Sequence, residues 1–211
     1  MLDVTQVGSW PRSEKLLAAL TERQEGRLSR EAFERLADDE VRACVAQQLD
    51  AGVDILVDGE QRRDNFYSFI TDKVDGTRLM TLAELVDRPG FKRTLQKLDV
   101  PPSAIKNATC VGTLSRREPL AVGELRFVRQ LSDKPVKVPL PGPYLLARSM
   151  WVEGFTDQAY ASPEALADDV VKILREEILD LKAAGCAFVQ LDEPVLSDVV
   201  FSAKAGETKF F

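Results

Sequence analysis

The sequence predicts an α/β fold in which short parallel strands are joined by helices. Short apolar, β-rich runs alternate along the chain with long segments of helical periodicity. In addition, two segments share the same order of helix, glycine, strand and acidic residue, and Glu60 and Glu193 each fall eight residues after the glycines, Gly52 and Gly185. Repeated units of this kind are typical of parallel strands connected by crossover helices.

The composition is that of a globular protein and excludes several classes of partner. The chain has 211 residues, of which 45% are hydrophobic and 29% are charged. Its formal net charge is −6, and basic residues cluster no further than pairs such as Arg62-Arg63, so we expect neither nucleic acid nor a membrane surface as a partner. The start of the sequence lacks the pattern of a signal peptide, which predicts a cytoplasmic protein.

The first part of the chain predicts two strands and two helices. Val4–Ser9 is expected to be a strand that ends in a Gly-Ser turn, and Ser13 is a suitable N-cap for the helix that follows. Ser29 is expected to cap a longer helix, in which apolar residues recur at helical spacing as far as Leu49. A second strand, Ile55–Val57, then ends at the acidic turn Asp58-Gly59-Glu60.

The stretch from about 64 to 107 interrupts this rhythm. It is too long for a simple loop between a strand and a helix, and it predicts a short helix with one or two added strands. Such an excursion would either cover a substrate or be an elaborated loop.

The second half of the chain predicts three more strands and two more helices. They are a strand at 108–114, a helix from about 119 to 131, a strand at 136–138, a long helix that begins at Ser162-Pro163, and a strand at 187–191. The last strand ends at Asp192-Glu193, as the second ends at Asp58-Gly59-Glu60.

The groups at the strand ends suit a small zwitterion. Folds with parallel strands place their active sites at the carboxyl ends of the strands. Backbone N–H groups in the Gly8-Ser9 turn can bind a carboxylate, and paired acids such as Asp58, Glu60 and Asp192 can bind an ammonium. An α-amino acid carries both groups. Two other interpretations stay open: a glycosidase-like hydrolase that uses Glu60 and Glu193, and acids that only cap loops.

The sequence contains no histidine, which excludes Ser-His and Cys-His nucleophile pairs and any metal site that includes histidine. Its three cysteines, Cys44, Cys110 and Cys186, are far apart and lie in apolar contexts. They are expected to be reduced and mostly buried thiols.

Five motifs together resemble one enzyme family. They are Val7-Gly8-Ser9-Trp10-Pro11, Asp58-Gly59-Glu60, Asp133-Lys134-Pro135-Val136-Lys137, Gly142-Pro143, and Gln190-Leu191-Asp192-Glu193-Pro194-Val195-Leu196. In order and spacing they resemble the catalytic domain of cobalamin-independent methionine synthase. The resemblance is closer to the short, single-barrel members of that family. The wider superfamily includes uroporphyrinogen decarboxylase-like barrels. The resemblance implies a (β/α)8 TIM barrel that transfers a methyl group from methyl-tetrahydrofolate to the thiol of homocysteine. Residues 1–211 would be its N-terminal portion, the first five of eight βα units.

The resemblance also implies roles for individual residues. Val7, Gly8 and Ser9 would hold the carboxylate of homocysteine, while Glu60 and Asp192 would hold its amino group. Asp58, Glu193 and Trp151 would support the site. Side chains alternate along a strand, so Glu60 and Asp192 can converge only if the chain leaves strand geometry at Gly59 or Pro194.

Other implications of the resemblance concern zinc and completeness. Family members activate homocysteine on zinc held by a His-x-Cys pair, a glutamate and a further cysteine, and no residue of this chain matches these ligands. We therefore expect zinc in full-length members, and methyl-tetrahydrofolate or another methyl donor as the source of the methyl group. We expect this chain to be a truncated barrel that is inactive alone. An incomplete barrel has open strand edges, which also predicts self-association, and the corresponding alternative function is that of a non-catalytic module that pairs with a copy of itself.

Overall fold

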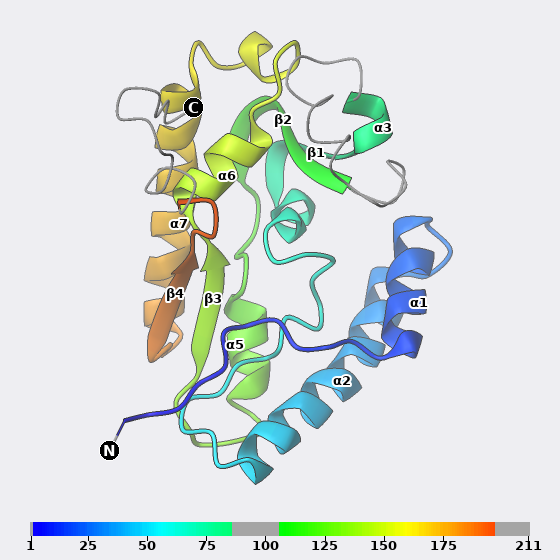
Figure 1. Cartoon of the computed structure of the whole chain (residues 1–211), viewed down its shortest axis with the longest axis vertical. Helices are drawn as coiled ribbons and strands as arrows, with labels where there is room; N and C mark the ends of the chain where they lie inside the picture. Colours follow the sequence, from blue (N-terminus) through cyan, green and yellow to red (C-terminus); the bar gives the residue numbers. More distant parts are fainter. Residues whose placement is uncertain (1, 86–105, 197–211) are drawn as a thin grey trace, which may run out of the picture. The chain divides into compact units, whose positions relative to one another are not determined.

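The chain forms two compact units. A computed structural model describes residues 2–85 and 106–196 (Figure 1). The first unit comprises residues 1–66, 121–140 and 177–190, and the second comprises residues 67–120, 141–176 and 191–211. Each unit has a hydrophobic core of its own.

Three helices belong wholly to the first unit: α1 (Glu14–Gln24), α2 (Arg30–Asp50) and α5 (Val122–Val128). The hydroxyl of Ser13 accepts a hydrogen bond from the amide of Leu16, and Ser29 accepts one from Ala32 in the same way. Both predicted N-caps are therefore confirmed. The hydrogen bond to the cap fixes where each helix starts. The apolar stripe along the helix fixes which face is buried.

Parallel backbone segments lie beside these helices. Thr5 forms a parallel bridge with Ile55, and Leu56 forms one with Val136, so the first two predicted strands are present as short bridged segments. Val136 leads into β3 (Lys137–Pro141), which pairs with β4 (Phe188–Asp192); the two arrows run in the same direction in Figure 1. The carboxyl ends of the bridged segments and of β3 therefore lie at the same edge of this parallel arrangement. Gly8 and Glu60 each follow one of the bridged segments, so both lie at that edge.

The core of the first unit is built from α2, α5, β3 and the C-terminal part of α7 (Pro163–Ala183). Its fully buried members include Val41, Leu56, Val128, Leu140 and Leu181. Complete burial of a side chain of this size stabilises the fold by about 1.5–3 kcal/mol. This core fixes the parallel segments from which the candidate site residues project.

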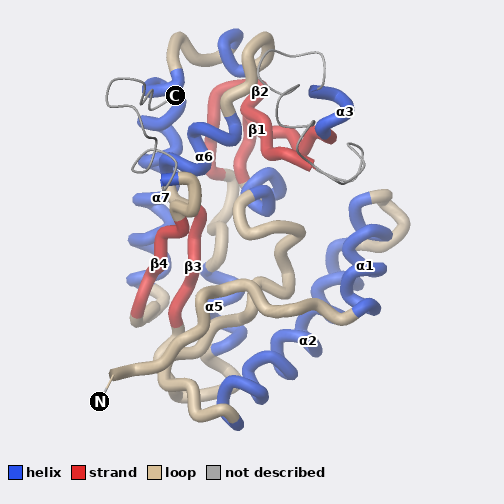
Figure 2. Tube along the Cα trace, in the orientation of Figure 1, coloured by secondary structure: helices blue, strands red, loops and turns tan. Residues whose placement is uncertain are grey.

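The second unit contains an antiparallel pair, β1 (Val74–Thr81) and β2 (Lys106–Arg116). The strand predicted at 108–114 is present as part of β2, but its partner is β1 (Figure 2). The prediction of five parallel units is therefore wrong for this strand, and the described residues contain four parallel segments. An apolar run does not specify its neighbour, and the preceding excursion supplies one.

The remaining elements of the second unit are η1 (Ser68–Asp72), α3 (Leu82–Leu85), α6 (Pro143–Met150), η2 (Thr156–Gln158) and the N-terminal part of α7. The short helix predicted early in the excursion corresponds to η1, a 3-10 helix. Residues 86–105 of the excursion lie outside the described residues. The core of this unit gathers side chains from η1, β2, α6 and α7, among them Phe69, Cys110, Met150 and Leu174.

Candidate functional site

Gly8 and Glu60 lie next to one another in the first unit. A Cβ atom placed on Gly8 would lie 2.9 Å from the Glu60 Oε1 atom and 3.2 Å from the Cγ of Pro139. Gly8 is buried, whereas Val7 and Ser9 on either side of it are exposed. The lack of a side chain at position 8 therefore lets the Glu60 carboxylate approach the bend of the backbone.

The backbone turns sharply at Gly59-Glu60. Gly59 has φ 71° and Glu60 has φ 55°, which places a non-glycine residue in the left-handed region. Asp58 Oδ1 accepts a hydrogen bond from the Glu60 amide at 3.0 Å, and Arg12 Nη2 donates to the Glu60 carbonyl at 2.9 Å. The chain thus leaves strand geometry at Gly59, one of the two positions at which the sequence permits this. Non-glycine residues held in this conformation are concentrated at functional sites.

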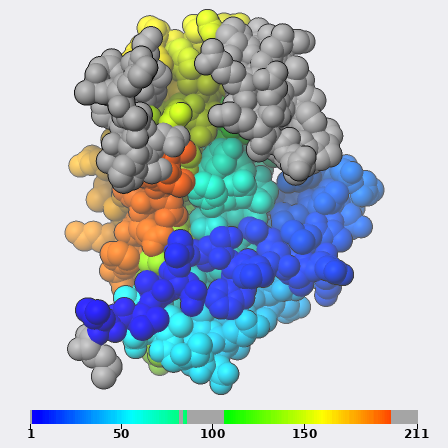
Figure 3. Space-filling model, viewed as in Figure 1, coloured from blue at the N-terminus to red at the C-terminus, as the bar shows by residue number. Residues whose placement is uncertain are grey.

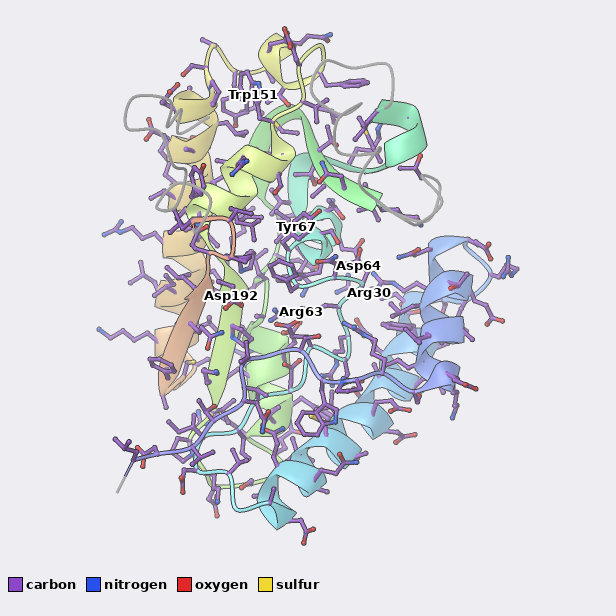
Figure 4. All side chains as sticks on the ribbon, in the orientation of Figure 1. Arg30, Arg63, Asp64, Tyr67, Trp151 and Asp192 are labelled. Carbon is purple, nitrogen blue, oxygen red and sulfur yellow. The ribbon has the colours of Figure 1, made fainter. Side chains whose placement is uncertain are left out.

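A buried arginine lies next to this turn. Arg63 is 1% exposed, and its Nη2 and Nε atoms donate to Glu124 Oε2 at 2.6 Å and 3.1 Å. Its Nη1 atom donates to the carbonyl of Pro139 at 3.0 Å and lies 3.5 Å from Glu60 Oε1. Figure 4 labels Arg63 and the neighbouring Asp64 in the loop that follows the second parallel segment. Arg63 therefore links this loop to α5 and β3.

The electrostatics of the cluster follow from its burial. Burial opposes the charge of Arg63, but the carboxylates of Glu124, Asp58 and Glu60 outweigh this and raise its pKa above the ordinary value. Burial, followed by repulsion from Glu124, raises the pKa of Asp58. Burial lowers the pKa of the half-buried Arg12, against the attraction of Glu60 and its acidic neighbours.

A second buried cation holds the segment that precedes Gly8. Lys137 is 2% exposed, and its ammonium donates to the carbonyls of Gln6 and Val7 and to Gln190 Oε1 at 2.7 Å. Gln190 Nε2 also donates to the Val7 carbonyl, at 2.8 Å. Lys137 and Gln190 thus fix the backbone of a segment whose outer surface is exposed, the blue band at the front of Figure 3.

The other predicted residues belong to the second unit. Asp192 is half-buried, and its carbonyl accepts a hydrogen bond from the Gly142 amide at 2.8 Å. Both carboxylate oxygens of Glu193 accept backbone N–H groups at the start of α6, from Tyr144 at 2.7 Å and from Leu145 at 2.8 Å. Glu193 therefore caps a helix, which is a structural role and argues against its use as a glycosidase acid or base.

Trp151 follows α6 directly and packs, half-buried, against the core of the second unit. The structure thus brings Gly8, Glu60 and Asp58 together in the first unit, and places Asp192, Glu193 and Trp151 in the second. Whether the two sets act on one ligand stays a prediction from the sequence.

Sequence reasoning missed the charged groups that hold the Glu60 turn, namely Arg12, Arg63 and Glu124, and the role of Lys137 beneath the segment before Gly8. In the sequence Arg63 stands out only as one of a basic pair, and Glu124 is 61 residues away from it in the chain. One signal was present, because Lys137 and Gln190 stand inside two of the family motifs.

The zinc site that the resemblance implies does not fit the residues that the structure describes. Across residues 2–85 and 106–196, no three Cys, Asp or Glu side chains are grouped in a way that could hold a metal ion. The three cysteines are free; Cys44 and Cys110 are buried, and Cys186 is half-buried. Burial raises the pKa of the Cys44 thiol to about 11, so this thiol is protonated at neutral pH. The expectation of mostly buried thiols is confirmed.

Among the helices within the described ranges, none combines the length and the apolar character that crossing a membrane requires.

The fold and the buried acidic turn define an α/β protein with a candidate ligand site at the carboxyl ends of parallel segments. Residues 2–211 match the model of the family described as cobalamin-independent synthase, catalytic domain. The chain belongs to this family, which confirms the resemblance found in the motifs.

Known relatives carry consistent names. The chain is 31% identical to a methionine synthase of Thermococcus kodakarensis over 93% of its own length and 53% of the relative's. It is 30% identical to a 5-methyltetrahydropteroyltriglutamate–homocysteine methyltransferase of Streptomyces griseus over 95% of its own length and 24% of the relative's. The chain therefore spans about a quarter to a half of these relatives.

Solved structures agree. A B12-independent methionine synthase from Shewanella sp. W3-18-1 in complex with selenomethionine is similar with a TM-score of 0.62 and 28% identity, over 81% of this chain and 45% of that one. A second similar structure, from Listeria monocytogenes, has a TM-score of 0.68 at 18% identity, covers 98% of this chain and 57% of that one, and supports the fold alone.

Proposed function

We propose that this chain carries the amino-acid half of the substrate site of a methyltransferase that moves a methyl group from methyl-tetrahydrofolate to the thiol of homocysteine. The observation that carries the proposal is that the Glu60 carboxylate lies beside the backbone bend at Gly8. A Cβ atom placed on Gly8 would be 2.9 Å from the Glu60 Oε1 atom. An anionic group and a bend of backbone amides, held side by side, can bind the ammonium and the carboxylate of one α-amino acid.

The roles proposed for the residues follow this division. The backbone of Val7, Gly8 and Ser9 holds the carboxylate, and Glu60 holds the ammonium. The family resemblance gives Asp192 the same role as Glu60. Asp58 supports Glu60 because its Oδ1 atom accepts a hydrogen bond from the Glu60 amide, at 3.0 Å. The relatives named as homocysteine methyltransferases support a sulfur-containing amino acid as the ligand. The Shewanella enzyme solved with selenomethionine, the selenium analogue of methionine, supports the same class of ligand.

No residue of this chain is assigned to activation of the thiol. The described residues do not fit zinc, so the proposed function contains no step through a metal. The proposed function is therefore restricted to recognition of the amino acid. For the architecture, we propose that residues 1–211 are the N-terminal portion of a single (β/α)8 barrel domain, with an inserted excursion at about 64–107.

Calorimetric titration of the 211-residue chain with L-methionine and L-homocysteine tests the proposal. We expect both to bind, and expect 4-(methylthio)butanoate, which lacks the amino group, to bind more weakly. Glu60→Gln should weaken the two amino acids and leave 4-(methylthio)butanoate unchanged. The matched control is Glu176→Gln on the exposed face of α7, which should change none of these affinities. Equal binding of all three ligands to the unaltered chain and to Glu60→Gln would refute the proposal.

A further inference from the structure

The guanidinium of Arg63 is shared unequally between two carboxylates. It donates two hydrogen bonds to Glu124 Oε2, at 2.6 Å and 3.1 Å, whereas its Nη1 atom lies 3.5 Å from Glu60 Oε1. Charge-assisted hydrogen bonds are usually about 2.7–2.9 Å long. The Arg63–Glu60 distance is therefore that of an ion pair without a direct hydrogen bond.

The geometry explains why the arginine stays at this distance. Glu124 on α5 engages the Nε and Nη2 edge, and the carbonyl of Pro139 on β3 accepts from Nη1 at 3.0 Å. A planar guanidinium held on two edges in this way has little freedom to rotate. Because Arg63 is 1% exposed, its charge is poorly screened, and small changes in its distance to Glu60 have large electrostatic effects.

We propose that Glu124 is a positioning residue that determines selectivity for an amino group at Glu60. By engaging Arg63, Glu124 keeps the guanidinium out of a direct hydrogen bond with Glu60. An incoming ammonium then pairs with Glu60 without displacing Arg63. This inference rests on the proposed function, since it assigns Glu60 to the ammonium of the ligand.

The consequence for a variant is specific. With Glu124→Gln, Arg63 loses its ionic hydrogen bonds to Glu124 but keeps its own charge, and Glu60 remains as an ionic partner, 3.5 Å from the Nη1 atom. Arg63 should move onto Glu60 and compete with the ligand's ammonium. Binding of the ligand's carboxylate and sulfur should be unaffected, because neither involves Glu60.

The first test compares two ligands on three forms of the full chain. For Glu124→Gln we expect the affinity for L-methionine to fall roughly tenfold, about 1.4 kcal/mol, because Arg63 then competes with the ammonium for Glu60. The affinity for 4-(methylthio)butanoate should stay unchanged. Glu177→Gln is the matched control, because Glu177 is also buried in the first unit and accepts a hydrogen bond from the Ala121 amide at 2.7 Å, at the start of α5. It should not separate the two ligands. A fall of both ligands together in Glu124→Gln would show a merely structural role and overturn the inference.

The second test needs no ligand. A crystal structure of Glu124→Gln should show the Arg63 Nη1 to Glu60 Oε1 distance shortened from 3.5 Å to hydrogen-bond length, about 2.9 Å. An unchanged distance would overturn the inference. If the unaltered chain fails to bind L-methionine, the proposed function fails, and this distance still decides whether Glu124 restrains Arg63.

Glu124→Asp covers the case in which Glu124→Gln does not fold. It keeps the charge on a shorter side chain, and should preserve the preference for L-methionine over 4-(methylthio)butanoate even where its stability is reduced. Loss of the preference in Glu124→Asp would contradict a role that depends on the charge.

Discussion

Gln48 on α2 pairs with the backbone of Val57 as a neighbouring strand would. Its Nε2 atom donates to the Val57 carbonyl at 2.8 Å, and its Oε1 atom accepts from the Val57 amide at 3.0 Å. Gln48 is fully buried. A side chain amide thus completes the hydrogen bonding of the segment immediately before Asp58, and so helps to fix the start of the acidic turn.

Replacing Gln48 by methionine should therefore destabilise the fold. The variant keeps the volume of the side chain but leaves both polar groups of Val57 without this partner, which costs about 1–3 kcal/mol per buried group. The measurement is the free energy of unfolding in urea. Gln47→Met is the control, because Gln47 is exposed on the same helix and its replacement should stay within about 0.5 kcal/mol. Equal effects of the two changes would contradict the role given to Gln48.

Gly59 and Gly123 should respond to alanine in opposite directions. Gly59 has φ 71°, and a Cβ there would lie 2.6 Å from Cys44 Sγ and 2.8 Å from the Cβ of Trp10. Gly59→Ala should cost at least about 1–2 kcal/mol from the left-handed backbone alone. Gly123 lies within α5 with nothing within 4 Å of its Cβ position, so alanine there should stabilise the helix by about 0.5–1 kcal/mol. Thermal unfolding of the two variants checks both signs.

Arg63 and Arg30 offer a comparison between a buried and an exposed ion pair; both are labelled in Figure 4. Arg63→Met leaves the carboxylate of Glu124 buried without its ionic partner and should cost about 3–5 kcal/mol. Arg30 pairs with Glu34 on the surface of α2, at 2.9 Å, so Arg30→Met should cost no more than about 0.5 kcal/mol. Unfolding in urea measures both. A small effect at Arg63 would show that its buried pair adds little to stability.

Asp58 should give stability a pH dependence of unusual sign. Burial raises its pKa in the folded state, so the folded protein binds a proton more tightly than the unfolded chain does. The contribution is fully favourable below the ordinary pKa of about 4 and is lost as pH rises through the raised value. Asp58→Asn keeps an oxygen acceptor for the Glu60 amide and removes the titration. Relative to the unaltered chain, this variant should gain stability as the pH is raised above about 4, in urea unfolding followed across pH. A constant difference would contradict a raised pKa.

The outer strand β4 should promote association. Within the described residues β4 pairs with β3 alone, and Phe188 on it is 49% exposed. Exposed strands that carry apolar side chains favour pairing between chains. Light scattering should show a mass that rises with concentration, and Phe188→Lys should abolish the rise. Val171→Lys on α7 is the control, since Val171 is also 49% exposed but lies on a helix. A monomer at all concentrations would contradict the prediction.

The helices were the part of the fold most accessible from the sequence. Ser13 and Ser29 mark helix starts because their hydroxyls satisfy amides three residues later, which is a local interaction. The partner of β2 could not be deduced in this way, since an apolar run fits an antiparallel neighbour as well as a parallel one. For the site, the alternation of side chains narrowed the departure from strand geometry to Gly59 or Pro194, and the structure shows it at Gly59. The pairing of Arg63 with Glu124 could not, because it joins residues 61 positions apart.

Because Glu193 caps α6, its substitution and the substitution of its neighbour Asp192 should affect different properties of the protein. Glu193 holds the first turn of a helix with both oxygens, and a Cβ on Gly142 would overlap its carboxyl carbon, so the fit leaves no room for adjustment. Loss of Glu193 should lower the yield of folded protein, whereas the role proposed for the adjacent Asp192 is in ligand binding. Sequence identity across such a motif therefore records architecture and ligand recognition together, and only a folding assay run beside a binding assay separates them.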